Sequence, residues 1–335
     1  MGDSTNGFDS LASESVVVED SNLNPVIQLT TWLLLSLTTL AFSFRLLTRF
    51  FIKGEAPFSH EDALIVLSYV FCFGESITMV IPESRIIGRD AGMISDDELK
   101  AGLKVAYSRD ILFVLSLMFA KLSVCASLFS LSPNQFHRRA TRILSSTILL
   151  WAITCLLSTI FQCGTHGPWE NDSCMDWRTF LYYEGLLNAF TDVILVIVPI
   201  AMIYPLHMSF KIKVTIMFLY SARLLTITAI VCQLIYLPRL FEDNFTLRGY
   251  PYFLCMQLVQ FTSFSSACAV YFLLFLRSLQ SGFLQASNSP PFTSANLSAS
   301  SYIKGSREGM SIMQGSCHEA DHRMRERTML LRGEF

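Results

Sequence analysis

Polar and ionisable side chains interrupt one stretch, residues 180–205, that is otherwise apolar enough to cross a membrane. Glu184, Asn188, Thr191 and Asp192 fall in this stretch, and at helical spacing they occupy a sector of about 100° on one face. A carboxylate in the hydrocarbon of a bilayer costs about 2.5–3.5 kcal/mol on insertion scales. We therefore expect this face to look into a helix bundle or a water-filled cavity.

Other ionisable groups lie in apolar stretches elsewhere in the chain, and intramembrane charges are functional-site hypotheses by default. Lys121 and Arg223 are the expected counter-ions of Glu75 and Asp192. Such pairs either serve a site or only hold the helices together, at about 1 kcal/mol per polar contact. The predicted binding cavity or polar core consists of Glu75, Lys121, Glu184, Asn188, Thr191, Asp192, Arg223, Gln257 and Gln260.

No residue is assigned a catalytic role. If the protein is an enzyme, Asp192, Glu184 and Glu75 are the candidates for acid–base chemistry, while Asp110 and Glu184 lie near predicted helix ends and can reach water. The sequence contains no CxxC, Walker or GxSxG pattern, and its one HExxH match, His318 to His322, falls in the tail 278–335 that we expect to be disordered, so we expect no metal and no cofactor. A retinal protein needs a lysine, usually in its last helix, and residues 252–276 contain none.

Composition indicates an integral membrane protein. The chain has 335 residues, of which 52% are hydrophobic and 16% charged, and its mean hydropathy is +0.44, whereas about a quarter of a soluble domain is charged. The net charge of −2 gives no reason to expect nucleic acid as a partner. Six of the nine cysteines lie in apolar segments, where they act as small hydrophobic residues.

Apolar segments of about 20–25 residues, the length that crosses a bilayer, predict an all-α fold, a seven-transmembrane-helix bundle. The acidic, polar residues 1–25 carry no signal peptide, and we expect them and residues 278–335 to be disordered tails around a 26–277 domain. The expected spans are 26–47, 62–82, 108–131, 143–162, 180–204, 214–236 and 252–276.

Basic residues in short connections predict an N-terminus outside and a C-terminus inside. The inner connections then carry eight basic and two acidic residues, and the two shorter outer ones three basic and five acidic residues. Glycosylation sequons at Asn171 and Asn244 fall in the same outer connections. Cys163 and Cys174 lie on this oxidising side, where a disulfide is expected and two free thiols are the alternative.

In its order of motifs, the chain resembles the fungal rhodopsin-like integral membrane domain family over about residues 30–277. The resemblance is carried by Arg45, Arg49, Glu61-Asp62, Lys121-Leu122-Ser123, Phe161-Gln162-Cys163, Trp169, Cys174, Asn188, Thr191-Asp192, Pro199 and Lys213. It departs from the family pattern after Lys121 and around Ser221-Ala222-Arg223. The resemblance implies a seven-helix protein of filamentous fungi, often encoded beside secondary-metabolite enzymes and related to receptor-like sensors, and it implies no retinal.

Several functions fit these observations. The first is a receptor-like sensor or an accessory membrane component of a secondary-metabolite pathway, with the bilayer, a small apolar ligand and a cytoplasmic signalling protein as partners. The alternative is an intramembrane enzyme with cyclase-like chemistry at Asp192 or Glu184, or a transporter of an apolar metabolite; a ligand-free scaffold is the third. The surroundings of Asp192 and Glu75 separate these functions. The two acids either line an open cavity or close onto Lys121 and Arg223. We expect a multi-pass integral membrane protein of the plasma membrane or an endomembrane.

Overall fold

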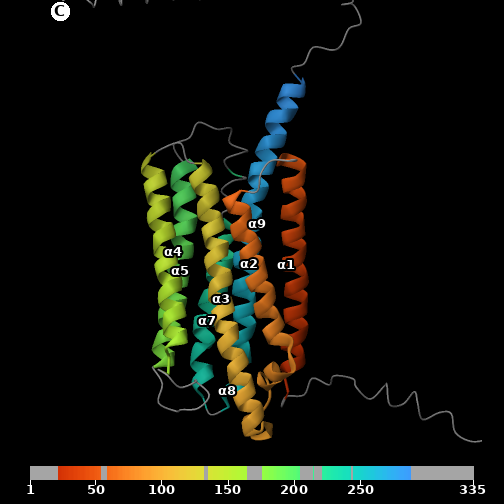
Figure 1. The fold of residues 1–335 in the computed structure, drawn as a ribbon, viewed down its shortest axis with the longest axis vertical. Coiled ribbons are helices and arrows are strands. Elements are labelled where there is room, and N and C mark those ends of the chain that lie inside the picture. Colours follow the sequence, from red (N-terminus) through yellow and green to blue (C-terminus); the bar gives the residue numbers. More distant parts are fainter. Residues whose placement is uncertain are drawn as a thin grey trace, which may run out of the picture. The chain divides into compact units, whose positions relative to one another are not determined.

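The computed structural model describes residues 22–53, 59–131, 135–163, 176–203, 214, 221–242 and 244–287. Residues up to Leu279 belong to one compact unit, and Gln280–Phe335 form a second. The helices of the first unit run side by side (Figure 1). The long helices are α1 (Asn24–Lys53), α2 (His60–Val80), α3 (Asp96–Leu131), α4 (Gln135–Ile160), α5 (Trp177–Ile203), α7 (Arg223–Tyr236) and α9 (Tyr250–Ser287).

Short elements join these helices at one end of the bundle. Two short 3-10 helices, η1 (Pro82–Ile86) and η2 (Ala91–Met93), lie between α2 and α3. A third, η3 (Leu237–Phe241), and the four-residue helix α8 (Phe245–Arg248) lie between α7 and α9. The extended structure among the described residues is a single bridge between Asn22 and Arg89.

Six of the described helices, α1 to α5 together with α7 and its η3 extension, are long and apolar enough to cross a membrane. They coincide with the first six predicted spans, although the structure describes the sixth mainly from Ser221 onward. The seventh predicted span is helical throughout and lies within α9, whose side chains are described only to residue 269. The seventh crossing and the orientation of the bundle therefore stay predictions.

Helices α3 and α4 begin earlier than hydropathy predicted. The expected connection 83–106 becomes helical at Asp96, because Ser95 and Glu98 form a capping box: each side chain binds the other residue's backbone N–H, at 3.3 and 3.2 Å. The expected basic loop before residue 143 is helical from Gln135. Hydropathy marks the hydrocarbon layer, and these helices extend beyond it.

The ends of the predicted bundle also shift. Asn22 and Asn24, assigned to a disordered tail, are held at the start of α1: the Asn24 amide donates to the carbonyl of Ile87 at 2.9 Å. At the other end, α9 continues to Ser287, past the predicted boundary at residue 277. The start of α5 is capped by Asp176, whose pKa is lowered by hydrogen bonds from Thr179.

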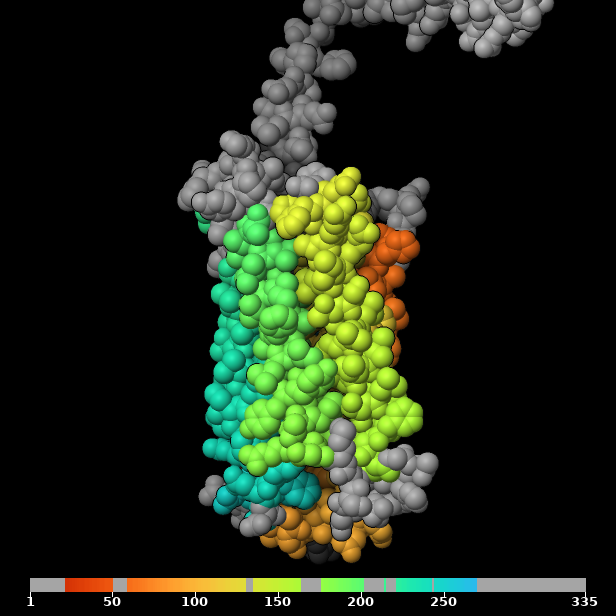
Figure 2. All heavy atoms as spheres, turned by 90° about the vertical axis from the view of Figure 1, so that its left-hand side faces the viewer, coloured from red at the N-terminus to blue at the C-terminus, as the bar shows by residue number. Residues whose placement is uncertain are grey.

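The first unit has its polar groups inside and many apolar groups outside. Large apolar side chains cover the outer faces of α4 and α5, which face the viewer in Figure 2; Leu150 is 64% exposed and Ile197 57%. Charged side chains such as Lys121 and Asp192 are fully buried. This arrangement suits a lipid solvent, in which apolar side chains gain nothing from being buried and polar groups gain partners.

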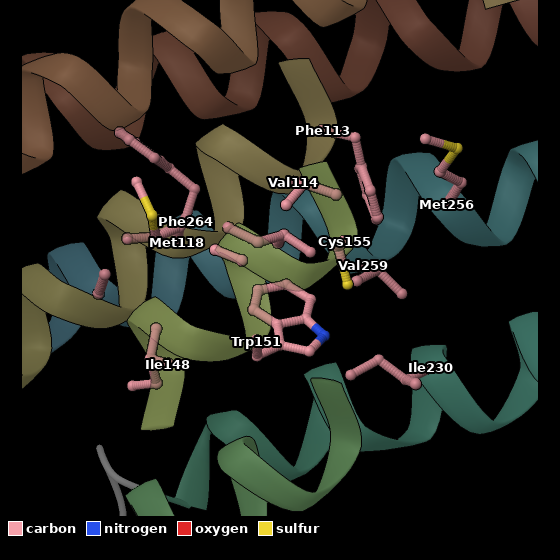
Figure 3. Close-up of a cluster of buried hydrophobic side chains, with 14 of the residues drawn as sticks. Phe113, Val114, Met118, Ile148, Trp151, Cys155, Ile230, Met256, Val259 and Phe264 are labelled. Atoms are coloured by element: carbon pink, nitrogen blue, oxygen red, sulfur yellow. The ribbon is translucent and has the colours of Figure 1, made fainter. Parts of the chain in front are cut away.

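A buried aromatic and aliphatic cluster fills the space between α3, α4, α7 and α9 (Figure 3). Trp151 of α4 lies at its centre, with Ile230 of α7 and Val259 of α9 nearby; all three are 2% exposed or less. The indole N–H of Trp151 donates to the backbone carbonyl of Glu184 in α5 at 3.2 Å. One side chain therefore joins apolar packing to a polar contact between α4 and α5.

Gly88 closes the end of the bundle where α1 begins. Its N–H donates to the carbonyl of Thr246 at 2.8 Å, and its carbonyl accepts from the N–H of Leu23 at 2.8 Å. Its φ of +86° lies in the left-handed region, and a Cβ atom there would come within 2.7 Å of the Asn24 nitrogen. Only glycine fits this connection without strain.

We predict that Gly88→Ala lowers the free energy of unfolding by about 2 kcal/mol or more, because left-handed strain of about 1–2 kcal/mol is added to a backbone clash. Thermal unfolding in detergent measures the change. The matched control is Gly92→Ala, whose added Cβ meets only the Asp90 side chain, at an ordinary 3.5 Å. Equal melting temperatures for the two variants would contradict this account.

Candidate functional site

One carboxylate, that of Asp192 on α5, lies between two cations from other helices. Lys121 of α3 places its Nζ 3.0 Å from Asp192 Oδ2, and Arg223 at the start of α7 pairs through Nη1 with Asp192 Oδ1. All three side chains are completely inaccessible to solvent. The charge cluster of Lys121, Asp192 and Arg223 therefore joins α3, α5 and α7, and it carries one more positive than negative charge.

Lys121 is satisfied mainly by α5. Its ammonium donates to the Asn188 backbone carbonyl at 2.9 Å, to Asn188 Oδ1 at 2.5 Å and to Thr191 Oγ1 at 2.7 Å. It also lies 5.2 Å from the centre of the Trp151 ring, within range of a cation–π interaction. One face of α5 thus provides Asn188, Thr191 and Asp192 as partners for a single lysine.

Arg223 is satisfied only in part. Its Nε and Nη2 atoms are buried without a hydrogen-bond partner among the described residues, so its recorded polar contact is the one to Asp192. The hydroxyl of Thr226, one turn further along α7, is likewise buried and unpaired. Within the described ranges, α7 is therefore joined to the charge cluster by one ion pair.

Glu75 forms a separate polar site between α2 and α9. Gln257 donates to Glu75 Oε1 at 2.7 Å, and Gln260 donates to Oε2 at 2.8 Å. The expectation that Lys121 or Arg223 would be its counter-ion is wrong, because both cations pair with Asp192. Two amides replace the cation, and hydrogen bonds from them satisfy both carboxylate oxygens.

The remaining predicted residues lie away from these two sites. Glu184, on the α5 face that holds Asn188 and Asp192, is only half-buried, and its carboxylate has no recorded hydrogen bond or ion pair. It lies within electrostatic range of Asp110 and Tyr252. Asp110 itself pairs with the neighbouring Arg109 at 2.9 Å, whereas Glu184 has no ion pair with any residue that the structure describes.

Arg45 and Arg49, two of the eight basic residues counted for the predicted inner connections, are instead buried in α1. Arg45 donates to the carbonyl of Ala267 at 2.9 Å, and Arg49 pairs with Asp62 at the start of α2 at 2.7 Å. They tie α1 to α9 and to α2.

The predicted modifications are only partly visible. Cys174 and Asn171 lie outside the described residues, so the disulfide with Cys163 and the first glycan stay predictions. Asn244 precedes α8 and is half-buried, and the Thr246 hydroxyl of its sequon donates to the Arg89 carbonyl at 2.7 Å. The cysteines in the apolar segments, Cys72, Cys125, Cys155, Cys232, Cys255 and Cys268, are free thiols.

Apolar helices long enough to span a bilayer, with apolar faces outward and paired charges inward, define a multi-pass integral membrane protein. A sequence model of the fungal rhodopsin domain matches residues 44–274, and the chain belongs to that family. The family expected from the motifs is thereby confirmed. No curated protein and no solved structure matches the chain.

We predict that Asp192→Asn and Arg223→Gln differ sharply in stability. Asp192→Asn leaves two buried cations without a counter-charge, and removal of one partner from a buried ion pair costs about 3–5 kcal/mol. Arg223→Gln leaves a matched Lys121–Asp192 pair and removes two unsatisfied nitrogens, so we expect less than half of that loss. Thermal unfolding of the purified variants measures both changes; an equal or larger loss for Arg223→Gln would contradict the prediction.

Proposed function

We propose that the protein is a receptor-like membrane sensor in which the charge cluster holds α7 against α5 in the resting state. The observation that carries this proposal is the sharing of one carboxylate by two cations on different helices. Disruption of either contact leaves a buried charge uncompensated, so the cluster favours discrete arrangements over gradual deformation. A sensor needs such a bistable element between its ligand and its signalling surface.

The partners of the two cations support α7 as the helix that moves. If α7 separates from α5, Lys121 retains Asp192, Asn188 and Thr191, all of them on α5. Arg223 loses its recorded polar partner. The α3–α5 contact is thus the fixed part of the cluster, and the α5–α7 contact is the part that a ligand can shift.

The proposed ligand is a small apolar molecule that reaches the bundle through the bilayer, and the proposed output is a cytoplasmic signalling protein. With the N-terminus outside, the connections rich in basic residues face the cytoplasm. Family membership supports a place beside a secondary-metabolite pathway, where the protein reports a metabolite or assists the pathway as an accessory membrane component.

A second candidate, an intramembrane enzyme, is favoured by Glu184 alone. Asp192 closes onto its two cations and is not available as a proton donor, whereas the half-buried Glu184 carboxylate has no recorded partner. An apolar substrate beside Glu184 would find an acid in a setting of low polarity. Glu184→Gln therefore separates this candidate from the sensor.

We predict that a strain carrying Arg223→Gln in place of the wild-type protein shifts the transcripts of a whole gene set, because α7 is released while the protein remains folded. Transcript and metabolite profiles of the wild-type, deletion and Arg223→Gln strains measure the effect. The matched control is Arg239→Gln, since Arg239 is exposed and stacks on Tyr236 at 4.9 Å.

Two outcomes contradict the sensor. One is an unchanged set of transcripts in both the deletion and the Arg223→Gln strains. The other is accumulation of a single pathway intermediate that wild-type membranes convert; loss of this conversion in Glu184→Gln membranes would establish the enzyme.

A further inference from the structure

The first two turns of α4 concentrate positive charge at the end of the helix where the helix dipole is also positive. Arg138, Arg139 and Arg142 follow the helix start at Gln135 within two turns, and the first turn contains no acidic residue. Cations at this end of a helix are unfavourable, whereas an anion is stabilised by about 0.3–1 kcal/mol. A negatively charged group would therefore be stabilised at the start of α4.

The same arginines line a cavity. It has a volume of about 330 Å³ and is bounded by Phe129, Gln135 and the three arginines. Arg138 is held over the Phe129 ring, 4.3 Å from its centre. The cavity thus presents three guanidinium groups, which suit phosphate because their planar forks bind two oxygens at once.

An apolar groove adjoins the arginine cavity and shares Arg142 and Phe129 with it. This groove, of about 520 Å³, runs between α2, α3 and α4 and includes Leu64, Leu122 and Ala126 in its lining. These residues lie inside helices long enough to cross the membrane. A polar cavity at the start of α4 therefore continues into a mainly apolar groove between membrane-spanning helices.

Among the described residues, no acidic side chain forms an ion pair with these three arginines. Arg139 and Arg142 make no ion pair or hydrogen bond in the described part of the chain, and the recorded contact of Arg138 is with an aromatic ring. Two acids at the start of α2 have other partners: the Glu61 carboxylate, in the groove wall, accepts from Ser127 at 3.0 Å, and Asp62 pairs with Arg49. The positive charge remains available to an external anion.

We propose that this site binds one anionic phospholipid, with its phosphate at Arg138, Arg139 and Arg142 and an acyl chain in the groove. The combination favours a lipid over free phosphate, because free phosphate would leave the groove unfilled. In the predicted orientation the site faces the cytoplasmic leaflet, where anionic lipids are concentrated. The lipid joins α4 to α2 and α3, and its binding does not depend on the proposed sensor function.

Native mass spectrometry of the full-length protein in detergent tests the proposal, with phosphatidic acid as the probe and phosphatidylcholine as the neutral comparison. We expect phosphatidic acid to bind with 1:1 stoichiometry and at least tenfold more tightly than phosphatidylcholine. The triple variant R138Q/R139Q/R142Q should lose this preference. The matched control R85Q/R178Q/R239Q removes three arginines that are exposed elsewhere, and it should retain the preference.

A second variant separates a lipid from free phosphate. Ala126→Trp fills the groove and leaves the arginines unchanged, so it should weaken phosphatidic acid binding at least tenfold, and inorganic phosphate should not displace the lipid from the wild-type protein. Unaltered phosphatidic acid binding by the arginine triple variant or by Ala126→Trp would overturn the proposal. So would displacement of the lipid by millimolar inorganic phosphate. Thermal unfolding without added lipid verifies that each variant is folded.

Discussion

The burial of Asp192 is the constraint on which the rest of this structure depends. A carboxylate at zero exposure within a membrane helix needs polar partners close by, and here two helices provide a cation each. Lys121 fixes α3 against α5, and Arg223 fixes the start of α7 against the same carboxylate. Because lipid gives helices no hydrophobic reason to associate, these polar contacts set which helices are neighbours in this part of the bundle.

Other buried polar contacts join the remaining helices in the same way. Glu75 and the two glutamines join α2 to α9, Arg45 joins α1 to α9, and Arg49 joins α1 to α2. In the described part of the chain, buried nitrogens without a hydrogen bond are found in Arg45, at Nε, as well as in Arg223, at Nε and Nη2. Arg223 has Asp192 as its polar partner among the described residues, and the proposed movement is therefore placed at the start of α7.

Helical periodicity and hydropathy were enough to predict part of this arrangement. The face of α5 that holds Asn188, Thr191 and Asp192 follows from spacing alone, and these residues are buried as expected. The partner of Glu75 could not be predicted, because amides and cations both satisfy a carboxylate and only the packing of α9 against α2 decides between them. Trp151 was missed since a tryptophan in an apolar span carries no polar signal. The early start of α3 was readable in the Ser95–Glu98 capping box.

The central claim is that Asp192 is an ionised counter-charge and not a proton donor. Infrared spectroscopy of the purified wild-type protein and its Asp192→Asn variant tests this most directly. We expect the variant to lose intensity from the carboxylate stretching bands and to leave the carbonyl band of protonated carboxylic acids unchanged. If the variant instead loses a protonated-carboxyl band, Asp192 is neutral in the wild-type protein. The shared ion pair would then not exist, and acid chemistry at Asp192 would return as a function.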